Sequence, residues 1–105
     1  MEAVPSSDAG PVVLDLGGEM GAAVLEAPGW AEGAEIEIRR LGLAWDGRHA
    51  SVRGRYVAGG QVHAAVFGSL EQGRWEARWR GGSTPGPACS FEVGGGRVTR
   101  VRLNR

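Results

Sequence analysis

The sequence predicts an all-β domain, an antiparallel sandwich of seven or eight strands preceded by a flexible N-terminal tail. Short runs of alternating apolar and polar residues recur between glycine clusters, a pattern typical of sandwiches built from many short strands. Helical spacing is lacking, because no window of about twelve residues free of glycine and proline has apolar residues at i, i+3, i+4 and i+7. The chain of 105 residues has room for one domain.

The composition of the chain excludes several classes of protein. Its 12 basic residues, all arginine, balance 12 acidic residues, so no net charge attracts the chain to nucleic acid or to an anionic membrane. A single cysteine excludes a disulfide framework. Arginine without lysine, beside abundant alanine and glycine, is typical of bacteria with GC-rich genomes. Residues 1–11 lack the features of a signal peptide and no apolar run could span a membrane, so we expect a cytoplasmic protein.

The first part of the chain is expected to hold the tail and the first strands of the sandwich. Residues 1–11 are predicted to be the flexible tail, because proline, glycine and small polar residues leave nothing to bury, and residues 12–105 form the domain. Strands are predicted at 12–16, 22–27 and 35–41, and residues 43–45 are either a short strand or part of a connecting segment. Isoleucines alternate with charged residues in 35–41, which indicates one face on a core and one in water.

A β-hairpin is predicted from His49 to Phe67. Its expected loop, Ala58-Gly59-Gly60, offers glycine for the left-handed position of a three-residue turn. In this register Val57 pairs with Gln61 and Arg55 lies opposite His63. Tyr56, Val62, Ala64 and Val66 then share an apolar face, and the polar face carries His49, Arg53, Arg55, His63 and Phe67. Pairing Arg55 with Ala64 instead mixes the two faces, so the first register is favoured.

Three further strands are predicted in the last third of the chain. In the strand at 74–80, Trp75, Ala77 and Trp79 point inward. The outward residues are Glu76 and three arginines, one of which is Arg78. The strands at 88–93 and 97–103 turn Cys89, Phe91 and Val93, and Thr99, Val101 and Leu103, toward the core. Cys89 is therefore expected to be a buried, unreactive thiol.

The second half of the chain has a distinctive order of residues and segments. It begins with four spaced residues, Phe67, Leu70, Gly73 and Trp75. A loop rich in glycine and proline, a Phe-Glu-Val strand and a glycine turn follow them. Over residues 61–104 this order resembles the prealbumin-like β-sandwiches, also called transthyretin-like or carboxypeptidase regulatory-like domains, with tryptophan where tyrosine is usual. The resemblance implies an immunoglobulin-like arrangement of two sheets. It also implies an accessory or binding module, because that superfamily consists mostly of such modules.

The segments VLDLGGEMGAA and GGGRVT also resemble a group of short actinobacterial proteins, some of which are called phospholipases. The residues argue against hydrolysis, because none of the six serines lies in a Gly-x-Ser-x-Gly motif. His49 and His63 are expected roughly 20 Å apart along the hairpin, too far to share a metal ion or to act as an acid–base pair. We therefore predict no catalytic residue, no metal and no cofactor.

The candidates for partner binding are six side chains: Arg53, Arg55, His63, Arg78, Trp30 and Trp45. Arginine suits bidentate contact with a carboxylate or phosphate. Glutamates at 35, 37 and 76 could instead neutralise the arginines from neighbouring strands. The two tryptophans fall in connecting segments, where an indole ring can stack on a sugar, anchor a partner or cover the end of a sandwich.

These observations predict a non-enzymatic accessory or protein-binding module. A protein partner could use the face of Arg53, Arg55 and His63, or pair with an exposed sheet edge, which is also a route to self-association. Three alternatives remain open. The first is a small hydrolase-like enzyme whose pocket gathers His63, Arg55 and a carboxylate, the second is a carbohydrate-binding module that uses Trp30 and Trp45, and the third is a purely structural subunit.

Overall fold

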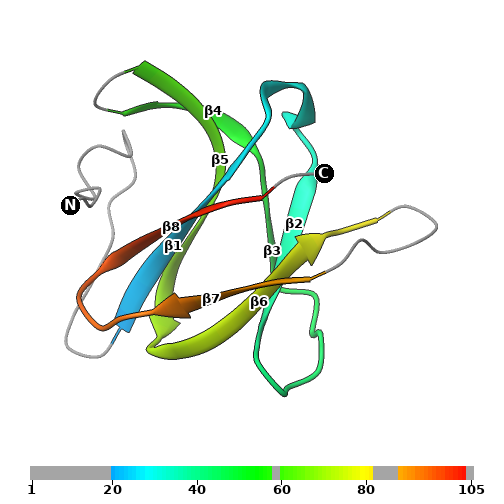
Figure 1. Cartoon of the computed structure of the whole chain (residues 1–105). Coiled ribbons are helices and arrows are strands. Elements are labelled where there is room, and N and C mark those ends of the chain that lie inside the picture. Colours follow the sequence, from blue (N-terminus) through cyan, green and yellow to red (C-terminus); the bar gives the residue numbers. More distant parts are fainter. Residues whose placement is uncertain (1–19, 58–59, 82–87, 104–105) are drawn as a thin grey trace.

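A computed structural model of the chain describes residues 20–57, 60–81 and 88–103, which form two four-stranded sheets (Figure 1). Sheet A has the strand order β4-β5-β1-β8, and sheet B has the order β3-β2-β6-β7. The strands are β1 (Met20–Ala27), β2 (Glu35–Arg40), β3 (His49–Ser51), β4 (Arg53–Val57), β5 (Gly60–Glu71), β6 (Gly73–Trp79), β7 (Cys89–Val93) and β8 (Val98–Arg102). One 3-10 turn, η2 (Gly29–Ala31), follows β1. The prediction of an all-β fold is confirmed for the described residues.

The hydrophobic core lies between the two sheets. Sheet B contributes Ile36, Ile38, Trp75, Ala77, Trp79, Phe91 and Val93, and sheet A contributes Ala23, Leu25, Ala27, Ala65, Phe67 and Leu70. The inward residues predicted for β2, β6 and β7 are confirmed, although the Cys89 side chain is half-buried at the margin of the core. The alternation along these strands matches a sheet with one face on the core and one in water.

The sheets are not wholly antiparallel, which corrects the prediction. β8 runs parallel to β1, with Ala22 beside Val98 and Glu26 beside Arg102. Within the described residues, the other pairs of neighbouring strands are antiparallel. The reason is the connection: β8 follows β7, which belongs to the other sheet, so no hairpin sets the direction in which β8 meets β1.

The predicted hairpin strand from His49 onward is split between the two sheets at Val52. β3 pairs with β2 in sheet B, whereas β4 pairs with β5 in sheet A. Val52 is fully buried between them, its N–H donates to the Ala34 carbonyl at 2.8 Å, and its carbonyl accepts from the Gly33 N–H at 2.9 Å. Such a corner lets one run of extended chain serve two sheets.

The register of the hairpin also differs from the prediction. Val57 pairs with Gly60 and Tyr56 with Gln61, one residue away from the predicted pairing, and the loop residues 58–59 lie outside the described residues. His63 is therefore opposite Gly54, not Arg55. The slip reverses the faces of β5: Ala65 and Phe67 enter the core, and Val62, Ala64 and Val66 face away from it.

A bulge in β5 accounts for the spacing of Phe67 and Leu70. Ala23 of β1 lies opposite Phe67 and Gly21 opposite Leu70, so β5 carries one residue more than β1 over this stretch. Ser69 takes up the extra length with a left-handed backbone, φ 54°. Phe67 and Leu70, three residues apart, can thus both face the core.

Two predicted strands have other outcomes. Residues 43–45 form no strand but part of the loop between β2 and β3, where Leu43 is 60% exposed. The strand predicted at 12–16 and the tail at 1–11 lie outside the described residues. Among the described residues, no helix is long and apolar enough to cross a membrane.

Candidate functional site

The outer face of sheet B is covered by ion pairs. The antiparallel register of β2 and β6 sets Glu37 opposite Arg78 and Arg39 opposite Glu76. The charged atoms of these pairs are 2.5 Å and 2.7 Å apart, and further pairs join Arg80 to Glu35 at 3.0 Å and Arg40 to Glu71 at 2.7 Å. The expectation that the glutamates at 35, 37 and 76 neutralise the arginines holds for Arg78 and Arg80. Glu76 pairs with Arg39 instead, and within the described residues none of the three glutamates pairs with Arg53 or Arg55.

Trp45 lies within this ion-paired face. The Arg39 guanidinium carbon is 4.5 Å from the centre of its ring and that of Arg78 is 4.0 Å away, both within the range of a cation–π interaction. Glu37, the partner of Arg78, is only 8% exposed. Arg78 and Trp45, two of the six predicted partner-binding residues, are therefore engaged with their own chain, and a ligand would have to displace these contacts.

The outer face of sheet A has an aliphatic centre. Residues on this face alternate with core residues along β1, β5 and β8. They are Ala22, Val24 and Ala64, which are buried, and Val62, Val66 and Val98, which are half-buried. We call these six residues the outer apolar stripe. Arg53 and Arg55 of β4 border the stripe on one side, and Arg100 and Arg102 of β8 border it on the other.

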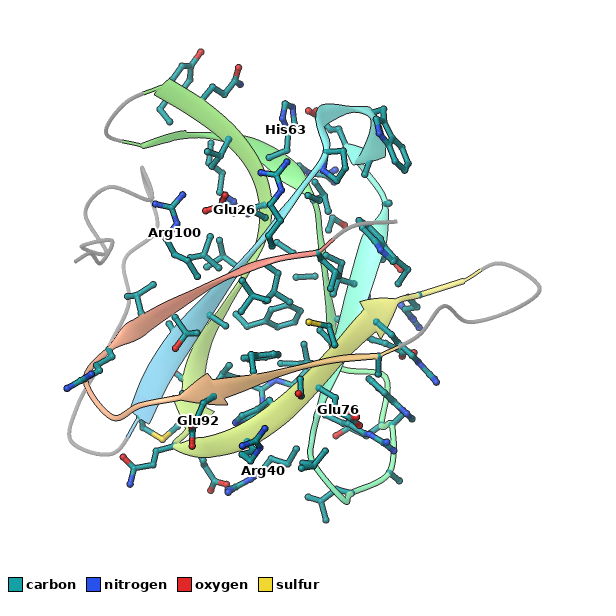
Figure 2. All side chains as sticks on the ribbon, in the orientation of Figure 1. Glu26, Arg40, His63, Glu76, Glu92 and Arg100 are labelled. Carbon is teal, nitrogen blue, oxygen red and sulfur yellow. The ribbon has the colours of Figure 1, made fainter. Side chains whose placement is uncertain are left out.

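The arginines of this face are mostly unpaired. Arg100 forms an ion pair with Glu26 of β1, and Figure 2 shows the two side chains next to each other. Within residues 20–57, 60–81 and 88–103, no ion pair involves Arg53, Arg55 or Arg102. The outer face of sheet A is thus positively charged over the described part of the chain, in contrast to the neutralised face of sheet B.

Arg55 has unfavourable surroundings for a cation. Its side chain is half-buried, and its Nε donates a hydrogen bond to the Ala64 carbonyl at 3.2 Å. Loss of water around the guanidinium lowers the pKa of Arg55, and the positive charge of Arg53 lowers it further. An anion at this place would compensate a cation that is both partly desolvated and close to a like charge.

His63 lies on the other face of sheet A, away from Arg53 and Arg55, so the prediction that the three share a face is wrong. Its Nε2 is 3.1 Å from Oε1 of Glu32, at the end of the molecule where η2 lies (Figure 2). A Cβ on Gly29 would lie 3.3 Å from the imidazole, so this glycine leaves room for the ring. Trp30, the next residue of η2, is 67% exposed.

The two histidines belong to different sheets. His49, in β3, has its Nδ1 2.7 Å from the Gly47 carbonyl oxygen and its Nε2 3.8 Å from a Glu35 oxygen. His63 is in β5 of sheet A. Within the described ranges, no three histidine, cysteine, aspartate or glutamate side chains gather in a way that could hold a metal ion.

No family model, curated protein or solved structure matches the chain.

Sequence reasoning missed three residues of these surfaces. Glu26 was detectable, since it continues the alternation of Ala22 and Val24 onto the outer face of β1. Glu32 has no sequence signal, because only the fold of the η2 loop brings it to His63. Tyr56 was expected on the apolar face, but it is 74% exposed, a consequence of the register of the hairpin.

Proposed function

We propose that the chain is a non-enzymatic accessory module of the bacterial cytoplasm that binds an acidic partner protein through the outer face of sheet A. The difference between the two outer faces carries this proposal. On sheet B, Arg39, Arg78 and Arg80 pair with glutamates of the same sheet. On sheet A, Arg53, Arg55 and Arg102 lack such partners among the described residues. The half-buried valines of the outer apolar stripe, bordered by arginines, suit a protein surface that supplies both apolar groups and carboxylates.

A prealbumin-like assignment for the fold is part of the proposal. Phe67 and Leu70 are both buried in the core across the bulge of β5. Gly73 has a left-handed backbone, φ 140°, at the start of β6, and the Trp75 indole N–H donates to the Glu71 carbonyl at 2.9 Å. The four residues that carry the resemblance thus lie on two consecutive strands, Phe67 and Leu70 on β5 and Gly73 and Trp75 on β6. Most members of that superfamily are accessory or binding modules, which supports the same class of function here.

The enzymatic and carbohydrate-binding alternatives have less support. A hydrolase-like pocket was expected to gather His63, Arg55 and a carboxylate, yet the side chains of His63 and Arg55 lie on opposite faces of sheet A. A sugar-binding platform was expected to use Trp30 and Trp45, but Trp45 already stacks with two arginines of its own chain.

The proposal is tested by capturing partners from a native cell extract with the full chain as bait. The variant Arg53→Ala/Arg55→Ala is compared with the control Arg74→Ala/Arg97→Ala. The control removes the same number of positive charges, from two arginines that are exposed elsewhere on the molecule. We expect the first variant to lose the captured protein and the second to retain it, with equal thermal unfolding midpoints. A partner that survives the loss of Arg53 and Arg55, or that both variants lose alike, would contradict the proposal.

A further inference from the structure

We propose that the partner contributes an extended acidic segment that adds to sheet A as a fifth strand along the free edge of β4, with its carboxylates on Arg53 and Arg55. This inference rests on the proposed function and specifies the form of the partner. Two observations support it: the edge of β4 is open among the described residues, and the spacing of Arg53 and Arg55 matches a strand with carboxylates at alternate positions.

The edge is the first observation. β4 is the terminal strand of sheet A and pairs with β5 alone among the described residues (Figure 1). A terminal strand presents backbone N–H and C=O groups on its open side, and an extended segment can use them as a template. The five residues of β4 are enough for a short added strand.

The spacing of the charges is the second observation. Arg53 and Arg55 are two residues apart on one strand, so they project from the same face about 7 Å apart. Carboxylates at alternate positions of a neighbouring strand have the same spacing and face the arginines as cross-strand pairs. The half-buried guanidinium of Arg55, with Arg53 close by, gains most from such a carboxylate, since charge-assisted hydrogen bonds are the stronger ones.

The same charges argue against a second copy of the chain. An antiparallel pairing of two β4 strands around Gly54 would set Arg53 of one copy opposite Arg55 of the other, twice. Like charges directly opposite each other destabilise a strand pair. Arginine on this edge therefore selects against self-association and in favour of an acidic segment.

Gly54 and Tyr56, on the face of β4 opposite Arg53 and Arg55, define which residues of the added segment fit between and beside its carboxylates. A Cβ on Gly54 would meet the Gln61 amide at 2.7 Å and the Glu32 carboxylate at 3.7 Å, so a small uncharged residue fits opposite Gly54. Tyr56 is 74% exposed and offers its ring to an apolar side chain. The preferred segment places an acidic, a small, an acidic and an apolar residue opposite Arg53, Gly54, Arg55 and Tyr56, the order that a strand parallel to β4 presents from its N-terminus.

The test uses a fluorescent hexapeptide, Thr-Glu-Ala-Glu-Val-Thr, capped at both ends, and its counterpart with lysine in place of glutamate. Anisotropy titrations with the full chain should show binding of the acidic peptide only. Arg53→Ala/Arg55→Ala should weaken it by about tenfold or more, and Arg53→Glu/Arg55→Glu should prefer the lysine peptide. Arg74→Ala/Arg97→Ala is the matched control, and circular dichroism verifies that each variant is folded. No binding of the acidic peptide, or equal binding of both peptides, would overturn the inference.

Backbone pairing is tested separately from charge. Methylation of alternate amide nitrogens of the acidic peptide should abolish binding, and the unmodified peptide should slow hydrogen exchange of the amides of residues 53–57. Full binding of the methylated peptide would refute strand addition, yet capture of the native partner that depends on Arg53 and Arg55 would still support the proposed function. Residues 1–19 carry four acidic and no basic residues. A variant that neutralises these four residues is Glu2→Gln/Asp8→Asn/Asp15→Asn/Glu19→Gln. If this variant bound the acidic peptide and the unaltered chain did not, the edge of β4 would belong to the chain's own acidic segment, which also overturns the inference.

Discussion

Replacement of Gly21 by alanine is expected to destabilise the fold severely. Gly21 lies in β1 where the strand passes the turn between β7 and β8. A Cβ at this position would be 2.3 Å from the Gly94 carbonyl oxygen, 2.8 Å from a Val93 methyl carbon and 3.0 Å from the Arg97 carbonyl oxygen. Two of these three neighbours are backbone atoms, which cannot be moved by a change of rotamer.

The size of the effect follows from these distances. Ordinary van der Waals contact begins near 3.4 Å, so the turn must retreat by about 1 Å. Two hydrogen bonds hold the turn on β1, from the Ala22 N–H to the Arg97 carbonyl at 3.0 Å and from the Gly96 N–H to the Met20 carbonyl at 2.8 Å. Overpacking costs about 1–3 kcal/mol and each of the two weakened hydrogen bonds about 1 kcal/mol, which together lower the free energy of unfolding by about 3–5 kcal/mol.

Urea unfolding followed by tryptophan fluorescence measures this loss. Gly54→Ala is the matched control, because its Cβ would be too close only to the movable end of the Gln61 side chain, at 2.7 Å, and no backbone atom is among its nearest neighbours. We expect the control to change the free energy of unfolding by less than about 1 kcal/mol. Equal losses for Gly21→Ala and Gly54→Ala would show that the close contact between β1 and the Gly94–Arg97 turn does not limit stability.

Two further predictions separate structural residues from surface residues. Arg78→Gln should lower the free energy of unfolding by about 1–3 kcal/mol, because Glu37, at 8% exposure, loses its partner. Arg55→Gln should lower it by less than about 0.5 kcal/mol. Similar losses for the two variants in thermal unfolding would contradict the contrast between the two sheets. Leu70→Ala should lower the free energy of unfolding in urea by about 2–5 kcal/mol, because the side chain is fully buried. Leu43→Ala should leave it almost unchanged, because Leu43 is 60% exposed. A Leu70→Ala protein as stable as the unaltered chain would contradict the position of the β5 bulge.

The strands that alternate regularly were predictable from the sequence. In β2 and β6, one side of each strand is apolar and the other charged, and both the elements and their inward faces agree with the prediction. The ion pairs across sheet B were expected from the same alternation, because opposite charges on one face of neighbouring strands meet whenever the strands pair. The partner of each arginine followed only from the register, which set Glu37 opposite Arg78 and Arg39 opposite Glu76.

The hairpin shows why the candidate site could not be predicted in the same way. Its two strands contain glycine and alanine on both faces, so hydrophobicity alone does not choose between neighbouring registers. The observed register turns Phe67, the largest apolar side chain of β5, into the core and places Val62 and Val66 outside. It also separates His63 from Arg53 and Arg55, which removes one predicted residue from the candidate surface.

The amino-acid sequence by itself determined that this chain is all-β, which faces of β2, β6, β7 and β8 turn inward, and that its balanced charges are able to pair across a sheet. Those properties are local: they depend on the period of the strand and on the chemistry of residues two apart. The tertiary structure alone decided that the chain changes sheets at Val52, that β8 runs parallel to β1, and that Arg53 and Arg55 lie together on an open edge without a carboxylate among the described residues. These properties depend on which strands become neighbours, and that is settled by the packing of Phe67, Leu70 and the other core residues of both sheets against one another.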